Sequence, residues 1–138
     1  MRYVLKQLIR CSFAALTVIA VGCGNPMAQI SGQVDYEDGS PVVGAIKVIN
    51  FVPTDDSTAE VRKAGSGVIE DDGSFSLSTK LPGDGVYKGK YAVTFNVLKN
   101  PATGESLIRT EYNRKKSTPF TVEVSGDKDD YHFQLKKL

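Results

Sequence analysis

The sequence predicts an all-β protein whose folded part is a single sandwich of seven strands. Apolar and polar residues alternate with a period of two in most segments after residue 29, and turn-forming residues separate these segments. No segment among them has convincing helical periodicity. A chain of 138 residues with ordinary hydrophobicity allows one compact domain and a short appendage. Seven strands at this spacing are typical of a β-sandwich.

The appendage is the N-terminal segment, residues 1–22. Three basic residues, Arg2, Lys6 and Arg10, lie in its first half. An apolar run at residues 12–21 follows them, which is the two-part pattern of a secretory signal. The run has about half of the roughly 20 residues that a membrane-spanning helix needs, and a glycine follows it in place of a basic stop-transfer cluster. We therefore expect a signal-peptide helix that is removed on export.

The segment that ends this signal, Ala20-Val21-Gly22-Cys23, resembles the lipobox of bacterial lipoproteins, in which small or aliphatic residues precede a lipidated cysteine. Alanine stands here where leucine is usual. The resemblance implies acyl chains such as palmitate on Cys23, and several chains on one cysteine hold a small domain at a membrane. The alternative is an ordinary signal cleaved after Gly22, because Ala20 and Gly22 also satisfy the small-x-small rule of signal cleavage.

Processing of this kind would give an exported protein, anchored by its N-terminal lipid to a bacterial membrane on the side of the cell envelope or periplasm. Residues 23–28 are small and polar, so we expect a short tether, followed by the domain at residues 29–138. Cys11, the other cysteine, lies in the removed segment, and no disulfide is expected. The remaining chain has 14 basic and 16 acidic residues, a net charge near −2. Nucleic acid is therefore not an expected partner.

The first predicted strand, residues 30–36, begins the folded part. Its sequence "ISGQVDY" puts Ile30, Val34 and Tyr36 on one face, and Gly32 allows a neighbouring backbone or ring to approach closely. The following "EDGSP" forms a turn, because glycine accepts positive φ and proline removes a backbone donor. The second strand, residues 44–52, is mostly apolar, as expected for a central strand or one with a bulge, and the pattern does not assign its faces.

The third and fourth strands, residues 65–69 and 74–78, are predicted to form a hairpin around "EDDG". Phe75 and Leu77 alternate there with three serines that we expect to face water. The fifth strand, residues 90–98, is expected in the core. The last two strands, residues 119–124 and 130–138, follow a long connection. The inward residues expected on these three strands are Tyr91, Val93, Phe95, Val97, Phe120, Val122, Val124, Tyr131, Phe133 and Leu135.

Several of these segments together resemble the carboxypeptidase regulatory-like domain. The matching motifs cover most of residues 29–138 and read "ISGQVDYEDGSPVVGA", "FVP", "DDGSFSLST", "PGDGVYKGKYAVTF", "FTVEV" and "FQL". With a lipobox in front, the chain is similar to small bacterial lipoproteins that carry this domain. The resemblance implies a transthyretin-like (prealbumin-like), seven-stranded Greek-key sandwich with no catalytic activity of its own.

The inventory of chemically reactive side chains is small. His132 is the only histidine, and alternation points it away from the core face of its strand. A Ser-His-Asp set or a zinc site therefore lacks its usual residues. We expect no enzymatic activity and no cofactor; the alternative is an enzyme-accessory or metal-dependent hydrolase domain on a transthyretin-like fold. Carboxylates in turns could gather around calcium, although Asp-Gly turns have the same composition. These carboxylates are Asp55, Asp56, Glu70, Asp71, Asp72, Asp84, Asp127, Asp129 and Asp130.

The long connection at residues 99–118 is the predicted binding loop. It carries a cluster of four basic residues around one tyrosine, namely Arg109, Tyr112, Arg114, Lys115 and Lys116. Long loops on rigid scaffolds often bind partners, and a tyrosine among cations can stack on a ligand. A solvated loop of no special function is the alternative. We therefore expect a non-catalytic binding or structural module of the cell envelope, which contacts a protein or glycan through its loops.

Overall fold

The computed structural model describes residues 25–138. The predicted signal-peptide helix at residues 1–22 and the predicted lipidation site at Cys23 lie outside the described residues. Within them the fold is all-β, as the sequence predicts, and no helix is long and apolar enough to span a membrane.

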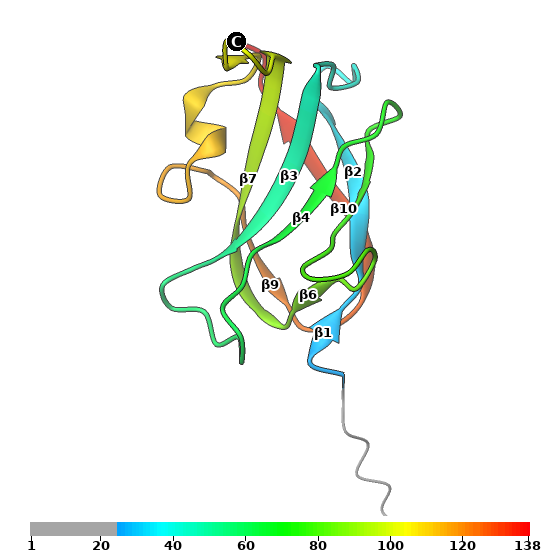
Figure 1. Ribbon diagram of the computed structural model, residues 1–138, viewed down its shortest axis with the longest axis vertical. Coiled ribbons are helices and arrows are strands. Elements are labelled where there is room, and N and C mark those ends of the chain that lie inside the picture. The colour runs from blue at the N-terminus through cyan, green and yellow to red at the C-terminus, as the bar shows by residue number, and fades with distance from the viewer. Residues whose placement is uncertain (1–24) are drawn as a thin grey trace, which may run out of the picture.

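Each of the seven predicted strands corresponds to a strand of the structure, and three further strands have two residues each (Figure 1). In chain order the elements are β1 (Met27–Ala28), β2 (Ile30–Tyr36), β3 (Ile46–Pro53), β4 (Gly65–Val68), β5 (Ser74–Ser76), β6 (Val86–Tyr87), β7 (Gly89–Asn100), β8 (Glu105–Ser106), the 3₁₀ turn η1 (Thr110–Asn113), β9 (Thr121–Val124) and β10 (Lys128–Leu135).

One sheet has three strands in the order β10-β2-β5. β2 pairs with β10 in parallel and with β5 in antiparallel orientation. The predicted close approach at Gly32 is confirmed, because a Cβ there would lie 2.1 Å from the carbonyl oxygen of Tyr131. The absence of a side chain at this position therefore lets β10 lie against β2.

The other sheet has five strands in which β7 is the longest. β3 pairs with one edge of β7 over eight residues, and β4 extends the sheet beyond β3. β8 and β9 pair with opposite ends of β7. β3 is a central strand, because it lies between β4 and β7, with residue 46 opposite 98 and residue 53 opposite 91 on β7. Ile49 and Phe51 are its fully buried residues, which assigns the face that the sequence pattern left open.

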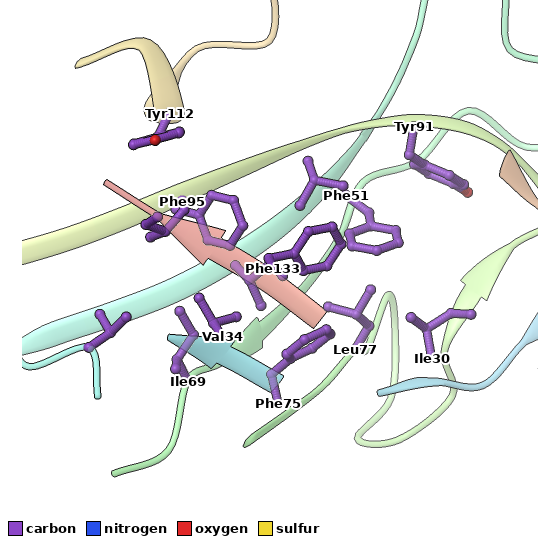
Figure 2. Close-up of a cluster of buried hydrophobic side chains, with 14 of the residues drawn as sticks. Ile30, Val34, Phe51, Ile69, Phe75, Leu77, Tyr91, Phe95, Tyr112 and Phe133 are labelled. Carbon is purple, nitrogen blue, oxygen red and sulfur yellow. The ribbon is translucent and has the colours of Figure 1, made fainter. Parts of the chain in front are cut away.

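The core lies between these two sheets and is rich in aromatic rings (Figure 2). The ring of Phe133 on β10 lies 6.2 Å from that of Phe51 on β3 and 5.8 Å from that of Phe95 on β7, measured between ring centroids. These edge-to-face contacts join the two sheets directly. The inward-facing residues predicted from the alternation are buried or packed against the core, which confirms the predicted facing of the last three long strands.

The predicted hairpin of the third and fourth strands is right at its turn and wrong in its pairing. The turn is closed by backbone bonds from Gly73 and from Glu70, at 2.9 and 2.8 Å. β4, however, pairs with β3, and β5 pairs with β2, so the two strands belong to different sheets. A single bridge, between Ser66 and Ser78, joins them. Burial of Phe75 and Leu77 between the sheets explains why β5 joins the opposite sheet.

Backbone hydrogen bonds hold the start of the described chain, so the fold begins before residue 29. We call the β1–β6 pairing and the adjoining bond from Lys88 to Pro26 the backbone clamp. β1 pairs with β6, and the N–H of Lys88 donates to the carbonyl of Pro26 at 3.0 Å. Gly85 has φ +81°, and a Cβ there would lie 1.9 Å from the carbonyl oxygen of Ala28. The segment expected as a tether is therefore part of the fold from Pro26 onward. We call this end of the sandwich the tether end and the opposite end the far end (Figure 1).

Candidate functional site

Tyr112 is not available to stack on a ligand, contrary to the sequence prediction. Only 3% of its surface is exposed, and its ring stacks on Phe120 at 5.9 Å between centroids with an interplanar angle of 20°. Its hydroxyl accepts a hydrogen bond from the backbone N–H of Lys136 at 3.0 Å. The η1 turn places this ring in the core. Burial there is favourable because the ring removes a large apolar surface from water.

The basic residues of the predicted binding loop separate into two groups on either side of Tyr112. Arg109 lies at the far end, where its Nε donates to the carbonyl of Lys137 at 3.4 Å. Lys115 points to the β3–β4 loop instead and makes an ion pair of 2.7 Å with Asp55. Arg114 and Lys116 are exposed beside it. The five residues therefore do not form one binding surface.

The structure brings Arg109 together with residues that the sequence analysis did not select. A shallow depression of about 290 Å³ lies at the far end, between the turn after β2, Arg109 and the C-terminal residues. Its lining residues are Tyr36, Glu37, Asp38, Arg109, Leu135, Lys136 and Lys137. Two lysines directly after the last strand were the signal that could have indicated this site. The lining contains three basic and two acidic side chains, so it suits a partner with both charges and hydrogen-bonding groups.

The charges in this far-end depression are ordered by one lysine. The ammonium of Lys137 lies 2.7 Å from Oδ2 of Asp38 and 5.2 Å from the ring centroid of Tyr36. Hydrogen bonds from Lys137, and then from Ser40, hold the pKa of the Asp38 carboxyl well below its usual range. Burial raises the pKa of the Tyr36 hydroxyl above its usual value of 10.0. Lys137 is thus engaged, whereas Arg109 and Lys136 are exposed and make no ion pair among the described residues.

A second depression, of about 440 Å³, lies over β4 and the segment after β5. Its lining has several hydroxyl groups, one lysine and no carboxylate, and consists of Val48, Ser66, Gly67, Val68, Ser76, Ser78, Thr79, Lys80, Leu81 and Pro82. Two of the hydroxyls are used internally, since Ser78 accepts from the N–H of Gly83 and Thr79 donates to the carbonyl of Gly85. This depression therefore offers a ligand one charged side chain, Lys80, and few free hydroxyl groups.

His132 has a partner that sequence periodicity did not indicate. Its Nε2 lies 2.9 Å from Oδ2 of Asp35, which is on the neighbouring strand of the parallel β2–β10 pair. The imidazole is half exposed on the outer face of the three-stranded sheet, as alternation predicts. The other carboxylate oxygen of Asp35 is buried without a hydrogen-bond partner. Neither depression described above includes this pair in its lining.

Two of the turn carboxylates, Asp84 and Asp72, accept hydrogen bonds within their own turns. Asp84 accepts the N–H groups of Thr79, Lys80 and Leu81 at 2.7 to 2.9 Å. These bonds hold the pKa of its carboxyl below the usual range. Asp72 accepts both the N–H and the hydroxyl of Ser74. Among residues 25–138, no three His, Cys, Asp or Glu side chains are grouped closely enough to hold a metal ion.

A comparison with protein-family models, curated proteins and solved structures found no match to this chain. The similarity to the carboxypeptidase regulatory-like domain therefore remains a prediction from the sequence motifs, and the all-β fold is what the structure establishes.

Proposed function

We propose that this protein is a non-catalytic, lipid-anchored binding or structural module of the cell envelope, which contacts a protein or glycan with its far end. The observation that carries the proposal is the position of the backbone clamp. The fold begins at Pro26, three residues after the predicted lipidation site, and the clamp holds this point at the tether end. The far-end depression, with Arg109 and Lys136, would then point away from the membrane (Figure 1).

The anchoring part of the proposal is supported by the order of segments in the chain. A basic region, a short apolar run and a cysteine in a lipobox-like context directly precede the first strand. The non-catalytic part is supported by the surroundings of His132, whose described hydrogen-bond partner is Asp35 on an open sheet face. A histidine in this position is not held against a hydroxyl or thiol nucleophile.

Membrane fractionation of the full chain tests the anchor. We expect the wild-type protein in the membrane fraction, labelled when cells are fed a radioactive fatty acid, and a Cys23→Ser variant in the soluble fraction without label. Membrane attachment of the Cys23→Ser variant would contradict lipid anchoring through this residue.

Cross-linking in intact cells tests the contact surface. We expect one dominant cross-linked species in the envelope, identified by mass spectrometry, whose yield falls in an Arg109→Ser, Lys136→Ser double variant because both cations line the far-end depression. The matched control is Arg114→Ser with Lys116→Ser, which removes the same charge from an exposed site outside this depression. Equal loss of yield in both double variants would indicate a general effect of charge and would contradict the proposed surface.

A further inference from the structure

The β3–β4 loop, residues 54–64, has at its tip an exposed apolar residue followed by two basic residues. Val61 is 38% exposed, and Arg62 and Lys63 follow it directly. The loop extends from the tether end, at the same end of the sandwich as β1 (Figure 1).

This loop is fixed to the base of β7. The buried Oγ of Ser57 accepts the N–H of Lys90 at 3.1 Å, and the carbonyl of Ser57 accepts from the guanidinium of Arg62 at 3.0 Å. Ser57 and Ala59 fit against Gly89, where a Cβ would lie within 2.8 Å of both residues. The position of the loop tip is therefore set by backbone packing on Gly89.

The same corner of the fold holds the start of the described chain. Lys88, which precedes Gly89, donates its N–H to the carbonyl of Pro26. The three peptide links between Pro26 and Cys23 can span at most about 11 Å. Lys88 thus holds the point from which an anchor would extend, and its neighbour Gly89 holds the loop through Ser57 and Ala59.

We propose that the tip formed by Val61, Arg62 and Lys63 docks on the surface of an anionic membrane, and so fixes how the domain stands on its anchor. The inference rests on the lipid anchor of the proposed function. An apolar residue flanked by cations fits the boundary between acyl chains and anionic headgroups, because the aliphatic group leaves water while the cations meet phosphate.

The charged side chains of the tip itself are net positive, since Glu60 stands against Arg62 and Lys63. Arg62, Lys63 and Lys88 make no ion pair among the described residues. Two of the three acidic residues of the loop are paired with lysines outside it, Asp55 with Lys115 and Asp56 with Lys90. Glu60 is the one exposed carboxylate of the loop without such a partner, so the tip has an excess of positive charge.

A fluorescent label at the tip tests the docking in the intact lipoprotein. With the signal removed and Cys23 lipidated as proposed, an introduced cysteine would be the single free thiol, because the chain has no cysteine besides Cys11 and Cys23. A Val61→Cys variant is labelled and reconstituted into vesicles of phosphatidylethanolamine and phosphatidylglycerol, and quenching by acrylamide is measured. The matched control is Val43→Cys, which replaces a valine 62% exposed in the β2–β3 connection at the far end.

We expect quenching of the label at position 61 to fall several-fold on reconstitution, while quenching at position 43 stays unchanged. Equal quenching at both positions, with the protein sedimenting with the vesicles, would overturn the docking and leave the anchor intact. Failure of both labelled proteins to sediment with vesicles would overturn the anchor and the docking together.

Charge reversal at residues 62 and 63 tests whether the shielding at position 61 depends on these two cations. In the labelled Val61→Cys protein, Arg62→Glu with Lys63→Glu should restore most of the quenching on phosphatidylglycerol vesicles, because the reversed charges repel the anionic surface. Arg109→Glu with Lys136→Glu, which reverses two exposed cations at the far end, is the matched control and should leave the shielding unchanged. Shielding that persists after reversal of residues 62 and 63 would overturn the role of the cations. Thermal melting of each variant checks that the fold is retained.

Discussion

The backbone clamp at the tether end places backbone against backbone with no room for a side chain, whereas the far-end depression is lined and ordered by side chains. The tether end has the β1–β6 clamp and the close approach of Gly85 to Ala28. The far end has the stack of Tyr112 on Phe120 and an ion pair between Lys137 and Asp38.

The difference indicates which end tolerates sequence change. A backbone contact without room for a Cβ accepts glycine alone, whereas exposed charged side chains can be exchanged at little cost. The end with the backbone clamp is the one that a lipid anchor would hold, and the end with the exposed charged side chains is the one proposed to meet a partner. The following variants test this contrast in order of decreasing effect.

The largest effect is expected for Gly85→Ala at the tether end. The new Cβ would lie 1.9 Å from the carbonyl oxygen of Ala28, and the residue would keep φ near +81°, so β1 must move away from β6. We expect a loss of about 3–4 kcal/mol in the free energy of unfolding, from backbone strain plus the lost pairing, measured by urea denaturation.

Gly83→Ala is the matched control for this variant. Gly83 also has positive φ, +73°, but nothing lies within 4 Å of a Cβ built there. Its substitution should therefore cost about 1 kcal/mol, which is the conformational part alone. Equal losses for the two alanine variants would show that the clamp contributes nothing beyond glycine's backbone freedom.

The next effect is expected at the far end, for Tyr112→Ala. Removal of a buried ring that stacks on Phe120 should lower the free energy of unfolding by about 3 kcal/mol, whereas Tyr112→Phe, which loses only the acceptor for the N–H of Lys136, should lower it by about 1 kcal/mol or less. Arg114→Ala, an exposed neighbour, should change it little. If Tyr112→Ala were as stable as Arg114→Ala in urea denaturation, the ring would not be part of the core.

A smaller, pH-dependent effect is expected for Tyr91→Phe. The buried hydroxyl of Tyr91 donates to the carbonyl of Tyr87 on β6 at 2.6 Å, and loss of this bond should cost about 1–2 kcal/mol near neutral pH. Burial raises the pKa of Tyr91 to about 12 from 10.0. Because the folded state keeps the proton more tightly, this contribution is complete below pH 10 and is lost as the pH rises towards 12.

Unfolding measured from pH 8 to pH 12 checks the prediction for Tyr91. The wild-type protein should lose more stability than Tyr91→Phe across this range, so that the two curves approach each other. Parallel curves would mean that the hydroxyl of Tyr91 is not shielded from water.

The alternation of apolar and polar residues along a strand is a local property of the sequence. It was sufficient to predict the all-β fold class and the core residues of the long strands. Phe133 and Phe95 are examples, since each has apolar neighbours two residues away along its strand. The pairing of β4 and β5 with different sheets was not predictable, because a hairpin and a crossing between sheets have the same turn residues. The burial of Tyr112 depends on Phe120 and Lys136, which are distant in sequence from one another.

The smallest effect is expected for Lys137→Met at the far end. Its ion pair with Asp38 is more than half exposed on both sides, where water screens the attraction and ordering of the side chains opposes it. The melting temperature at pH 7 should therefore match that of the wild-type protein within experimental scatter. The pKa of Asp38 is held low in the folded protein, so any contribution is present above its ordinary value of 3.8 and declines as the pH falls below it. A clear loss of stability at pH 7 that disappears in acid would show that the far end is held by this charge pair, and would remove the contrast between the two ends.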